Sequence, residues 1–584
     1  FTPAAGNFQG DDALNAEPDD GAGTISGLFP DPSHTDNANM STPPDGTSPR
    51  MQMYLFNDPV ADDPVFGGTP RSDPFIQGNG GDEAAIVYHE YTHGLSNRLV
   101  VDAMGNSTLG SGQADSMGEA WSDWYAMDFL VAQGNFVDTP ADGDLRIGQY
   151  VGAGQDLIRK QPMDCPVGST SPSCHGTPGA GPGGFTYGDF GKIIGRPEVH
   201  ADGEIWGETL WDLRGALGQT QAEGLVTRAM ELSPSNPSFL DMRNSILQAD
   251  LVDNGGSNHD TIWHVFANRG MGFFAGAVDG DDLAPVEDFS MPPTGQADGQ
   301  IKGTVTDADS GLPIPGIIVQ FGGHNSGFTG TLAALTDSKG KYRIKHIVPG
   351  TYPKVSAAGA GFDPQVQTVT VNSDDNPKVN FALRRDFAAL SGGGTIAAFN
   401  GPDFTGFGCG PSSAIDQSET NGWGSTTDGD DGASTGKVTP KFVVVQLPQA
   451  VTVSEITVNP SSTCGDGGSA STRGFKVEVS SDGTTFTQVA TGVFYAGNRA
   501  KENSVFSGSS PNVRFVKFWM LNPQVPTAPT VGGVTPACTG PADCGTDPND
   551  NSGVALHCTP PNVEGFSGCP FMDMSEIKVF GRAS

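Results

Sequence analysis

The chain has 584 residues and a formal net charge of −36, with 67 acidic and 31 basic side chains. This length exceeds a single hydrophobic core and predicts roughly three or four domains. The strong negative charge argues against nucleic acid or an anionic membrane as a partner. A membrane span is not predicted, because no stretch approaches about 18 uninterrupted apolar residues.

The first 82 residues are rich in Asp, Gly and Pro and contain one strand-like run, RMQMYLF (50–56). The chain starts at Phe rather than Met and shows no signal peptide. We therefore expect a mature, secreted chain whose targeting segments have been removed.

The helical signal is concentrated in residues 83–275. Apolar residues recur there at helical spacing, and glycines follow that are suited to end a helix. The predicted segments are 119–133, 204–217, 238–250 and 259–271, with stops at Gly134, Gly218 and Gly270. The stretch VEDFSMPPTGQADG (286–299) is typical of a linker. A first domain over 1–285 is therefore expected.

Beyond residue 300 the hydrophobic period changes to two. GQIKGTVTD, PGIIVQFGG, GKYRIKHI and QTVTVN alternate and are separated by turn residues, which predicts a β-sandwich over 300–385. KFVVVQLPQAVTVSEITVN, GFKVEVSSDGTTFTQVA and VRFVKFWML predict a second all-β domain over 386–584. The expected fold class is multidomain, with a helix-rich domain followed by two all-β sandwich domains.

Eight cysteines are present and none forms a CxxC pair, which favours disulfides formed in an oxidising compartment. We expect Cys165 and Cys174 to close a short loop and Cys409 to pair with Cys464. The sequence does not pair the remaining four, which are Cys538, Cys544, Cys558 and Cys569.

The segment AAIVYHEYTHGLSNRL (84–99) carries an HExxH motif. On a helix, His89 and His93 share one face and can hold one metal ion, with Glu90 about 100° to one side. A catalytic zinc needs a third protein ligand and an open position for water. Glu119 in SMGEAWSDWYA is the candidate, with Asp123 on the same face to accept a ring N–H.

Glu119 also has a purely structural interpretation. Ser116 and Glu119 have the spacing of a capping box, in which the glutamate caps the start of a helix. The HExxH motif favours the metal-binding interpretation, because it gives both Glu119 and Asp123 a role.

HEYTHGLSNRL followed by GEAWSDWYA resembles the fungalysin family of secreted zinc metallopeptidases, which are relatives of thermolysin. The resemblance continues in 36–56, 197–213, 237–250 and 262–272, and covers residues 6–275 or so. It implies an α+β thermolysin-like fold with a mostly α-helical C-terminal lobe. It also implies zinc on His89, His93 and Glu119, with Glu90 as the general base.

The resemblance suggests further site residues. His200 in EVHADGE is expected to stabilise the tetrahedral oxyanion, because thermolysin places a histidine there. Tyr187 in GFTYGDFG is a second candidate, or else a packed loop residue. Asn37 and Ala38 resemble the family's edge strand, which pairs with the substrate backbone, although Asn37 also suits a turn. For Arg159 a structural salt bridge is expected rather than a substrate pocket.

The C-terminal regions also resemble known modules. Residues 300–383 resemble the carboxypeptidase-regulatory-like sandwich, and residues 390–584 resemble a discoidin-like jelly roll. They are expected either to attach the chain to a glycan, polymer or cell surface, with Trp423 stacking on a sugar, or to act as stabilising spacers. The acidic loops 279–282 and 428–432 suit calcium or simply solvated charge.

Together these features predict a secreted, extracellular zinc metalloendopeptidase that acts on proteins or peptides. The alternative is a binding or structural protein built on an inactive peptidase fold. Only 88 residues precede His89, so the N-terminal lobe of the family is expected to be incomplete. We expect a precursor of zymogen type whose cleaved N-terminal fragment is retained, or self-association that covers the strand around Asn37. The alternative is a truncated lobe with a more open cleft.

Overall fold

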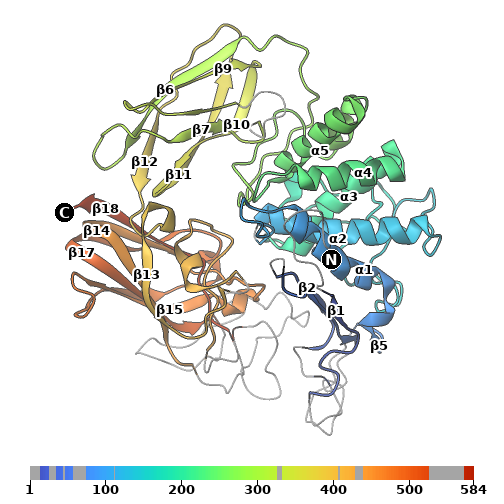
Figure 1. Cartoon of the computed structure of the whole chain (residues 1–584), viewed down its shortest axis with the longest axis horizontal. Coiled ribbons are helices and arrows are strands. Elements are labelled where there is room, and N and C mark those ends of the chain that lie inside the picture. The colour runs from blue at the N-terminus through green and yellow to red at the C-terminus, as the bar shows by residue number, and fades with distance from the viewer. Residues whose placement is uncertain are drawn as a thin grey trace.

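The structure is a computed structural model in which a helix-rich part is followed by β-rich parts, as expected (Figure 1). Within the part of the chain it describes, no helix is both long and apolar enough to cross a membrane. The described residues are 13–24, 30, 34–43, 46–56, 74–110, 112–324, 332–405, 408–427, 438–524, 568 and 571–584.

Short strands precede the first helix. They are β1 (Asn15–Glu17), β2 (Ala38–Ser41), β3 (Arg50–Met53), β4 (Leu55–Phe56) and β5 (Gly78–Asn79). The first three form a sheet in the order β1-β3-β2, so β2 lies at an edge. Met51, Met53 and Phe56 pack with Ile86 of α1 (Ala84–Leu99), which fixes the sheet against this helix.

The remaining helices of the first part are α2 (Gly112–Ala132), α3 (Val199–Leu217), α4 (Gln219–Glu231), α5 (Phe239–Asn254) and α6 (His259–Asn268). Their core is built on buried aromatic side chains, including Trp121, Trp206 and Phe266. The four predicted helical segments are confirmed. The sequence interpretation missed α4, although its buried residues Ala222, Leu225, Val226, Ala229 and Met230 follow one another at helical spacing.

A seven-stranded sheet follows, in the order β8-β7-β10-β11-β12-β6-β9. Its strands are β6 (Gly299–Asp307), β7 (Ile318–Phe321), β8 (Ala333–Leu335), β9 (Lys341–Ile347), β10 (Gly350–Gly359), β11 (Phe362–Val371) and β12 (Phe381–Arg385). We call this part the β6–β12 unit. Alternate residues are buried in β6 from Gly299 to Val305 and in β9 as far as Ile344, as the period of two predicts.

The last part is a sheet in the order β13-β14-β17-β15-β16, with β18 paired to β14. The strands are β13 (Thr395–Asn400), β14 (Lys441–Asn459), β15 (Thr472–Ser480), β16 (Thr487–Val493), β17 (Asn503–Pro523) and β18 (Glu576–Ala583). Trp423 is fully buried in its core. The expected sugar-stacking role of Trp423 is therefore wrong, because the ring offers no exposed face.

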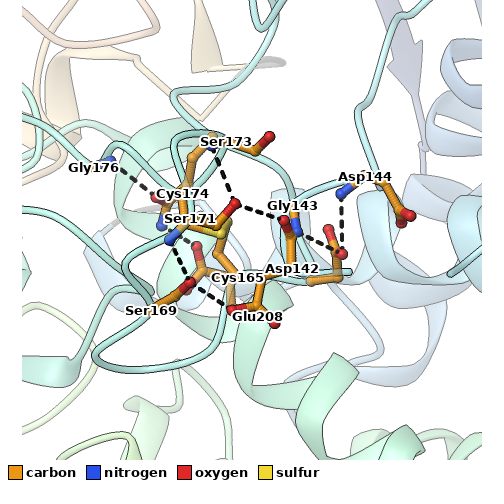
Figure 2. The surroundings of a disulfide bond; sticks show 12 residues. Asp142, Gly143, Asp144, Cys165, Ser169, Ser171, Ser173, Cys174, Gly176 and Glu208 are labelled. Atoms are coloured by element: carbon orange, nitrogen blue, oxygen red, sulfur yellow. Dashed lines mark hydrogen bonds between the residues drawn. A yellow bond between two sulfur atoms is a disulfide. The ribbon is translucent and has the colours of Figure 1, made fainter. Parts of the chain in front are cut away.

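Two predicted disulfides are confirmed, Cys165–Cys174 and Cys409–Cys464. Figure 2 shows the loop around the first, where Ser169 Oγ donates to Asp142 Oδ2 (2.6 Å) and Ser171 Oγ donates to the Asp142 carbonyl (3.0 Å). The bridge and these hydrogen bonds hold the loop against the chain near residue 142. Cys538, Cys544, Cys558 and Cys569 lie outside the described residues.

The expected linker 286–299 starts later than predicted. Val286 and Gly276 exchange two backbone hydrogen bonds of 2.8 and 2.9 Å, and Phe273 N donates to Ser290 O at 2.8 Å. Residues 286–290 are thus paired with 272–276 of the helical part. The sequence could not reveal this long-range pairing from the Pro- and Gly-rich composition that follows it.

Candidate metal centre and active site

Helix α1 presents the two histidines of the HExxH motif from successive turns. The Nε2 atoms of His89 and His93 face each other at 3.1 Å. The Glu83 side chain accepts from Ala85 N at the start of the helix, which fixes its first turn. The spacing of four residues therefore produces the convergence that the sequence predicts.

Helix α2 supplies the third group. Glu119 Oε2 lies 3.1 Å from His89 Nε2, and Glu119 Oε1 lies 3.5 Å from His93 Nε2. One donor atom from each of these three residues lies within 4.8 Å of the others. Because α2 begins at Gly112, Ser116 and Glu119 are inside the helix. The capping-box interpretation of Glu119 is therefore wrong.

Asp123 lies one turn after Glu119 on α2 and contacts His89 on the side of the ring opposite Glu119. Its Oδ1 atom is 2.7 Å from His89 Nδ1. Arg159 donates to both oxygens of the same carboxylate, from Nε to Oδ2 at 2.6 Å and from Nη2 to Oδ1 at 2.9 Å. Arg159 thus forms the buried salt bridge that was expected of it, and it fixes the carboxylate that orients His89.

The charges of this cluster are strongly coupled. Burial acts to lower the pKa of His89, but Asp123 and Glu119 together outweigh it and raise that pKa to about 10. Burial acts to raise the pKa of Glu119, but His200 and His93 hold it well below its usual range. Burial lowers the pKa of His93 to about 4. The cluster therefore provides an ionised carboxylate on Glu119 and a neutral imidazole on His93, while His89 would have to release a proton to hold a metal.

Glu90 follows His89 on α1 and is also buried. Burial raises the pKa of its carboxyl to about 7, although His89 acts in the opposite direction. A carboxyl group with a pKa near neutrality can both take up and release a proton, which is the property needed in a general base.

His200 lies at the start of α3 and reaches the same cluster. Its Nε2 atom is 3.4 Å from Glu119 Oε2, and its side chain is 47% exposed. Glu198, the N-cap of α3, accepts from the backbone N–H groups of His200 and Ala201 and lies 2.6 Å from His200 Nδ1. Desolvation acts to lower the pKa of His200, but Glu119 and Glu198 raise it to about 9.

The sequence interpretation missed Glu198. The available signal was its position two residues before His200 in a segment that starts a helix, since negatively charged side chains are favoured near a helix N-terminus. This one side chain caps α3 and also holds the imidazole ring of His200.

Tyr187 does not belong to the site. Its side chain is fully buried, its hydroxyl donates to Gln113 Oε1 (2.7 Å), and its ring stacks on Phe239. The prediction that it stabilises an oxyanion is wrong, because a phenol packed in the core cannot reach a substrate. The packed alternative is correct.

The predicted substrate-binding strand is present as β2. Ala38 pairs with Met53 of β3, and the carbonyl of the exposed Asn37 accepts from Tyr54 N at 3.3 Å. Strand β2 lies at the edge of its sheet and contacts α1. The strand is thus placed beside the helix that carries the two histidines.

The two acidic loops suit either calcium or solvated charge in the sequence. In the loop 279–282, Asp282 Oδ2 is 3.1 Å from Lys354 Nζ, and Asp281 Oδ1 accepts from Thr420 Oγ1 (3.1 Å). These contacts join the loop to other parts of the same chain. The second loop, 428–432, lies outside the described residues. The sequence interpretation did not single out a different acidic group, made of Asp138, Asp144 and Asp164.

Comparison with known proteins agrees with this geometry. Residues 1–275 match the model of the fungalysin metallopeptidases (M36), residues 300–384 that of the carboxypeptidase regulatory-like domain, and residues 399–530 that of the F5/8 type C domain. The extracellular metalloproteinase MEP of Pyricularia oryzae is 31% identical over 50% of this chain and 43% of its own length. The extracellular metalloproteinase mep of Aspergillus fumigatus is 33% identical over 47% of this chain and 40% of its own length. The chain thus spans less than half the length of these relatives.

Solved structures also resemble part of the chain. The C-terminal domain of a chitobiase from Bacteroides fragilis is 16% identical, covers 33% of this chain and 95% of its own, and has a TM-score of 0.21. A CBM32 module from a family 31 glycoside hydrolase of Clostridium perfringens is 15% identical, covers 32% of this chain and 91% of its own, and also has a TM-score of 0.21. These scores are too low to support an argument about this chain. The family matches thus make residues 1–275 similar to the fungalysin metallopeptidases (M36), with similarity to a carboxypeptidase regulatory-like domain and an F5/8 type C domain after them.

Proposed function

We propose that the chain is a secreted zinc-dependent endopeptidase that hydrolyses peptide bonds of extracellular proteins. The observation that carries the proposal is the convergence of His89, His93 and Glu119 beside the buried Glu90. The names of the extracellular relatives support secretion. An inactive binding protein built on the same fold is the less favoured alternative, because each group that the chemistry requires is present.

The donor set fits zinc. Two imidazole nitrogens and one carboxylate are typical of a catalytic zinc site, with ligand distances of about 2.0–2.2 Å. In tetrahedral geometry such ligands lie about 3.3–3.5 Å apart, close to the 3.1 and 3.5 Å seen here. Glu119 Oε2 is buried and lies 3.1 Å from His89 Nε2 and 3.4 Å from His200 Nε2, so it faces the nitrogen atoms that a metal would share with it.

Zinc in such a site lowers the pKa of water and polarises a carbonyl group. Glu90 is proposed to take the proton from the attacking water and to deliver it to the leaving amine. His200, held through Nδ1 by Glu198, is proposed to donate from Nε2–H to the developing oxyanion. Asp123 holds His89 through Nδ1, which would leave Nε2 available to hold the metal.

The substrate backbone is proposed to extend along β2. An edge strand presents unpaired N–H and C=O groups and binds an extended peptide by strand addition. The exposed Asn37 and the partly exposed Ala38 lie at the start of this strand. Because peptide backbones are common to all sequences, this mode fixes the orientation of the substrate, while side-chain pockets would set the cleavage preference.

For the β-rich parts we propose attachment to a glycan, polymer or cell surface, supported by the F5/8 type C match. Since Trp423 is buried, such binding would have to use other residues. Calcium, in the acidic loop 279–282 or elsewhere, is a proposal that rests on acidic composition alone.

The experiment is metal analysis of the purified chain combined with casein digestion. We expect about one zinc per chain, loss of digestion with a zinc chelator and recovery on adding zinc. Casein digestion by chain shown to be zinc-free would contradict the proposal. Stoichiometric zinc without hydrolysis of casein or of a peptide library would favour the inactive alternative.

A further inference from the structure

One face of the helical part is covered by the β6–β12 unit. On this face Arg243 of α5, 1% exposed, donates through Nη1 to the carbonyls of Met271 (2.9 Å) and Gly272 (2.8 Å). Its Nη2 atom donates to the carbonyl of Gly323 in the β6–β12 unit at 3.1 Å. The neighbouring Asn244 donates to the same carbonyl at 2.9 Å.

Arg243 is bound in an unusual way for a buried cation. Its hydrogen bonds within the described structure end on carbonyl oxygens, three from the main chain and one from the Asn244 side chain. The guanidinium carbon lies 4.6 Å from the centre of the Trp263 ring. A buried charge needs its full set of partners, and here the β6–β12 unit supplies one of them.

The two parts also approach each other too closely for side chains. A Cβ atom on Gly322 would lie 1.9 Å from the Ala277 carbonyl oxygen, and one on Gly323 would lie 2.7 Å from Leu240 Cδ1. A Cβ atom on Gly350 would lie 2.2 Å from a ring carbon of Phe274. Backbone of the β6–β12 unit therefore lies directly on the helical part, a contact that requires glycine.

Apolar and charged contacts complete this face. The ring centres of Phe274 and Tyr352 are 5.3 Å apart, and those of Phe273 and His324 are 4.9 Å apart. Lys354 of β10 pairs with Asp282 at its border. Relative motion of two domains is the default unless their interface is extensive and apolar. The glycine contacts, the shared aromatic packing and the shared buried cation argue against a flexible tether here.

We propose that the β6–β12 unit is an obligate structural partner of the peptidase domain, docked on α5 and residues 271–277, and that the two open and unfold as one cooperative unit. The unit then acts as an intrachain brace of the helical lobe instead of a mobile spacer. This inference is independent of the proposed function, because the contacts would have the same effect in an inactive chain.

Hydrogen–deuterium exchange of the full chain tests the proposal, with peptides from α5 and from β10 as reporters. The wild-type reporters should exchange at matching slow rates. Gly322→Ala places a methyl group against Ala277 without a left-handed backbone, and overpacking of this kind should speed exchange in both reporters by roughly 10-fold or more. Peptides from β14 should keep their rates.

A matched pair of variants separates the interface from backbone strain. Gly323 and Gly316 both have left-handed backbones, with φ of 81° and 75°, but a Cβ atom on Gly316 meets open space. Gly323→Ala should speed exchange in α5 as well as β10, whereas Gly316→Ala should affect the β6–β12 unit alone. If Gly323→Ala fails to fold, Lys354→Gln provides a milder test with the same expected direction.

Two results would overturn the proposal. One is a wild-type β10 reporter that exchanges much faster than α5, at a rate of its own. The other is an α5 reporter that keeps its wild-type rate in Gly322→Ala and Gly323→Ala while β10 accelerates.

Discussion

Asp123 Oδ1 lies 2.7 Å from Nδ1 of His89, on the side of the ring away from Glu119. This contact fixes which ring nitrogen carries the proton and which is free for a metal. The carboxylate is itself held by Arg159, so the orientation of His89 depends on a buried pair behind the site.

Replacing Asp123 by Ala should weaken zinc binding or activity by about 10–100-fold. The ring of His89 loses its acceptor, and Arg159 loses its main counter-charge. Zinc retained after dialysis against a weak chelator measures the effect, with Asp123→Asn as the control that keeps one acceptor oxygen. Full zinc retention and full activity in Asp123→Ala would show that the carboxylate does not orient the histidine.

His200 and Tyr187, the two predicted oxyanion donors, should respond very differently to substitution. His200→Ala should lower kcat by about 10²–10³-fold, as loss of an oxyanion donor does. Tyr187→Phe should leave kcat unchanged and lower the free energy of unfolding by about 0.5–1.5 kcal/mol, because one buried hydrogen bond is lost. Steady-state kinetics and urea unfolding check the pair, and a large loss of kcat in Tyr187→Phe would contradict the assignment.

His324 should make the protein less stable in acid. Burial, and then Arg243, lowers its pKa from 6.5 to about 3. A folded-state pKa below the unfolded value means that the folded chain holds fewer protons. The stability from neutral His324 is therefore complete above about pH 6.5 and is lost as the pH falls towards 3.

The variant His324→Phe should remove this dependence while keeping the ring contacts with Phe273 and Tyr352. Between pH 6.5 and 4 the wild type should lose on the order of 3 kcal/mol more free energy of unfolding than the variant. Urea unfolding at several pH values measures the difference. Parallel pH profiles for the two proteins would show that His324 does not titrate in this way.

Removing residues 386–584 should leave hydrolysis of short peptides unchanged, since each proposed catalytic group lies between Asn37 and His200. Binding to an insoluble or cell-surface substrate should fall if the last part is adhesive, and equal binding would support the spacer alternative. Loss of short-peptide hydrolysis by a folded truncated chain would mean that the last part contributes to the site.

Patterns over a few residues of the sequence predicted the structural features that depend only on neighbouring residues. The spacing of His89 and His93 on one helix, the alternation in β6 and the closure of the Cys165–Cys174 loop depend on local geometry, and all three are confirmed. Helix α4 was missed although Ala222, Leu225, Val226, Ala229 and Met230 recur at helical spacing, so the sequence carried a usable local signal for it.

Features set by tertiary packing could not be predicted in the same way. Tyr187 and Trp423 are typical site residues by type, and only the packed cores around them show that they are inaccessible. The partners of Arg243 could not be predicted from the sequence either, because the backbone carbonyls of Met271, Gly272 and Gly323 are distant in the chain and meet only in the folded protein. Glu198 carried a usable local signal in its position before His200.

The division of roles between Glu90 and the metal-binding residues is tested most directly by turnover of a zinc-loaded Glu90→Gln protein. The substitution keeps the size of the side chain and leaves His89, His93 and Glu119 in place. Zinc content should stay at the wild-type level, while kcat should fall by at least about 10²–10⁴-fold, because the proton-transferring group is gone. Hydrolysis near the wild-type rate by the zinc-loaded variant would contradict the role of Glu90 as the general base.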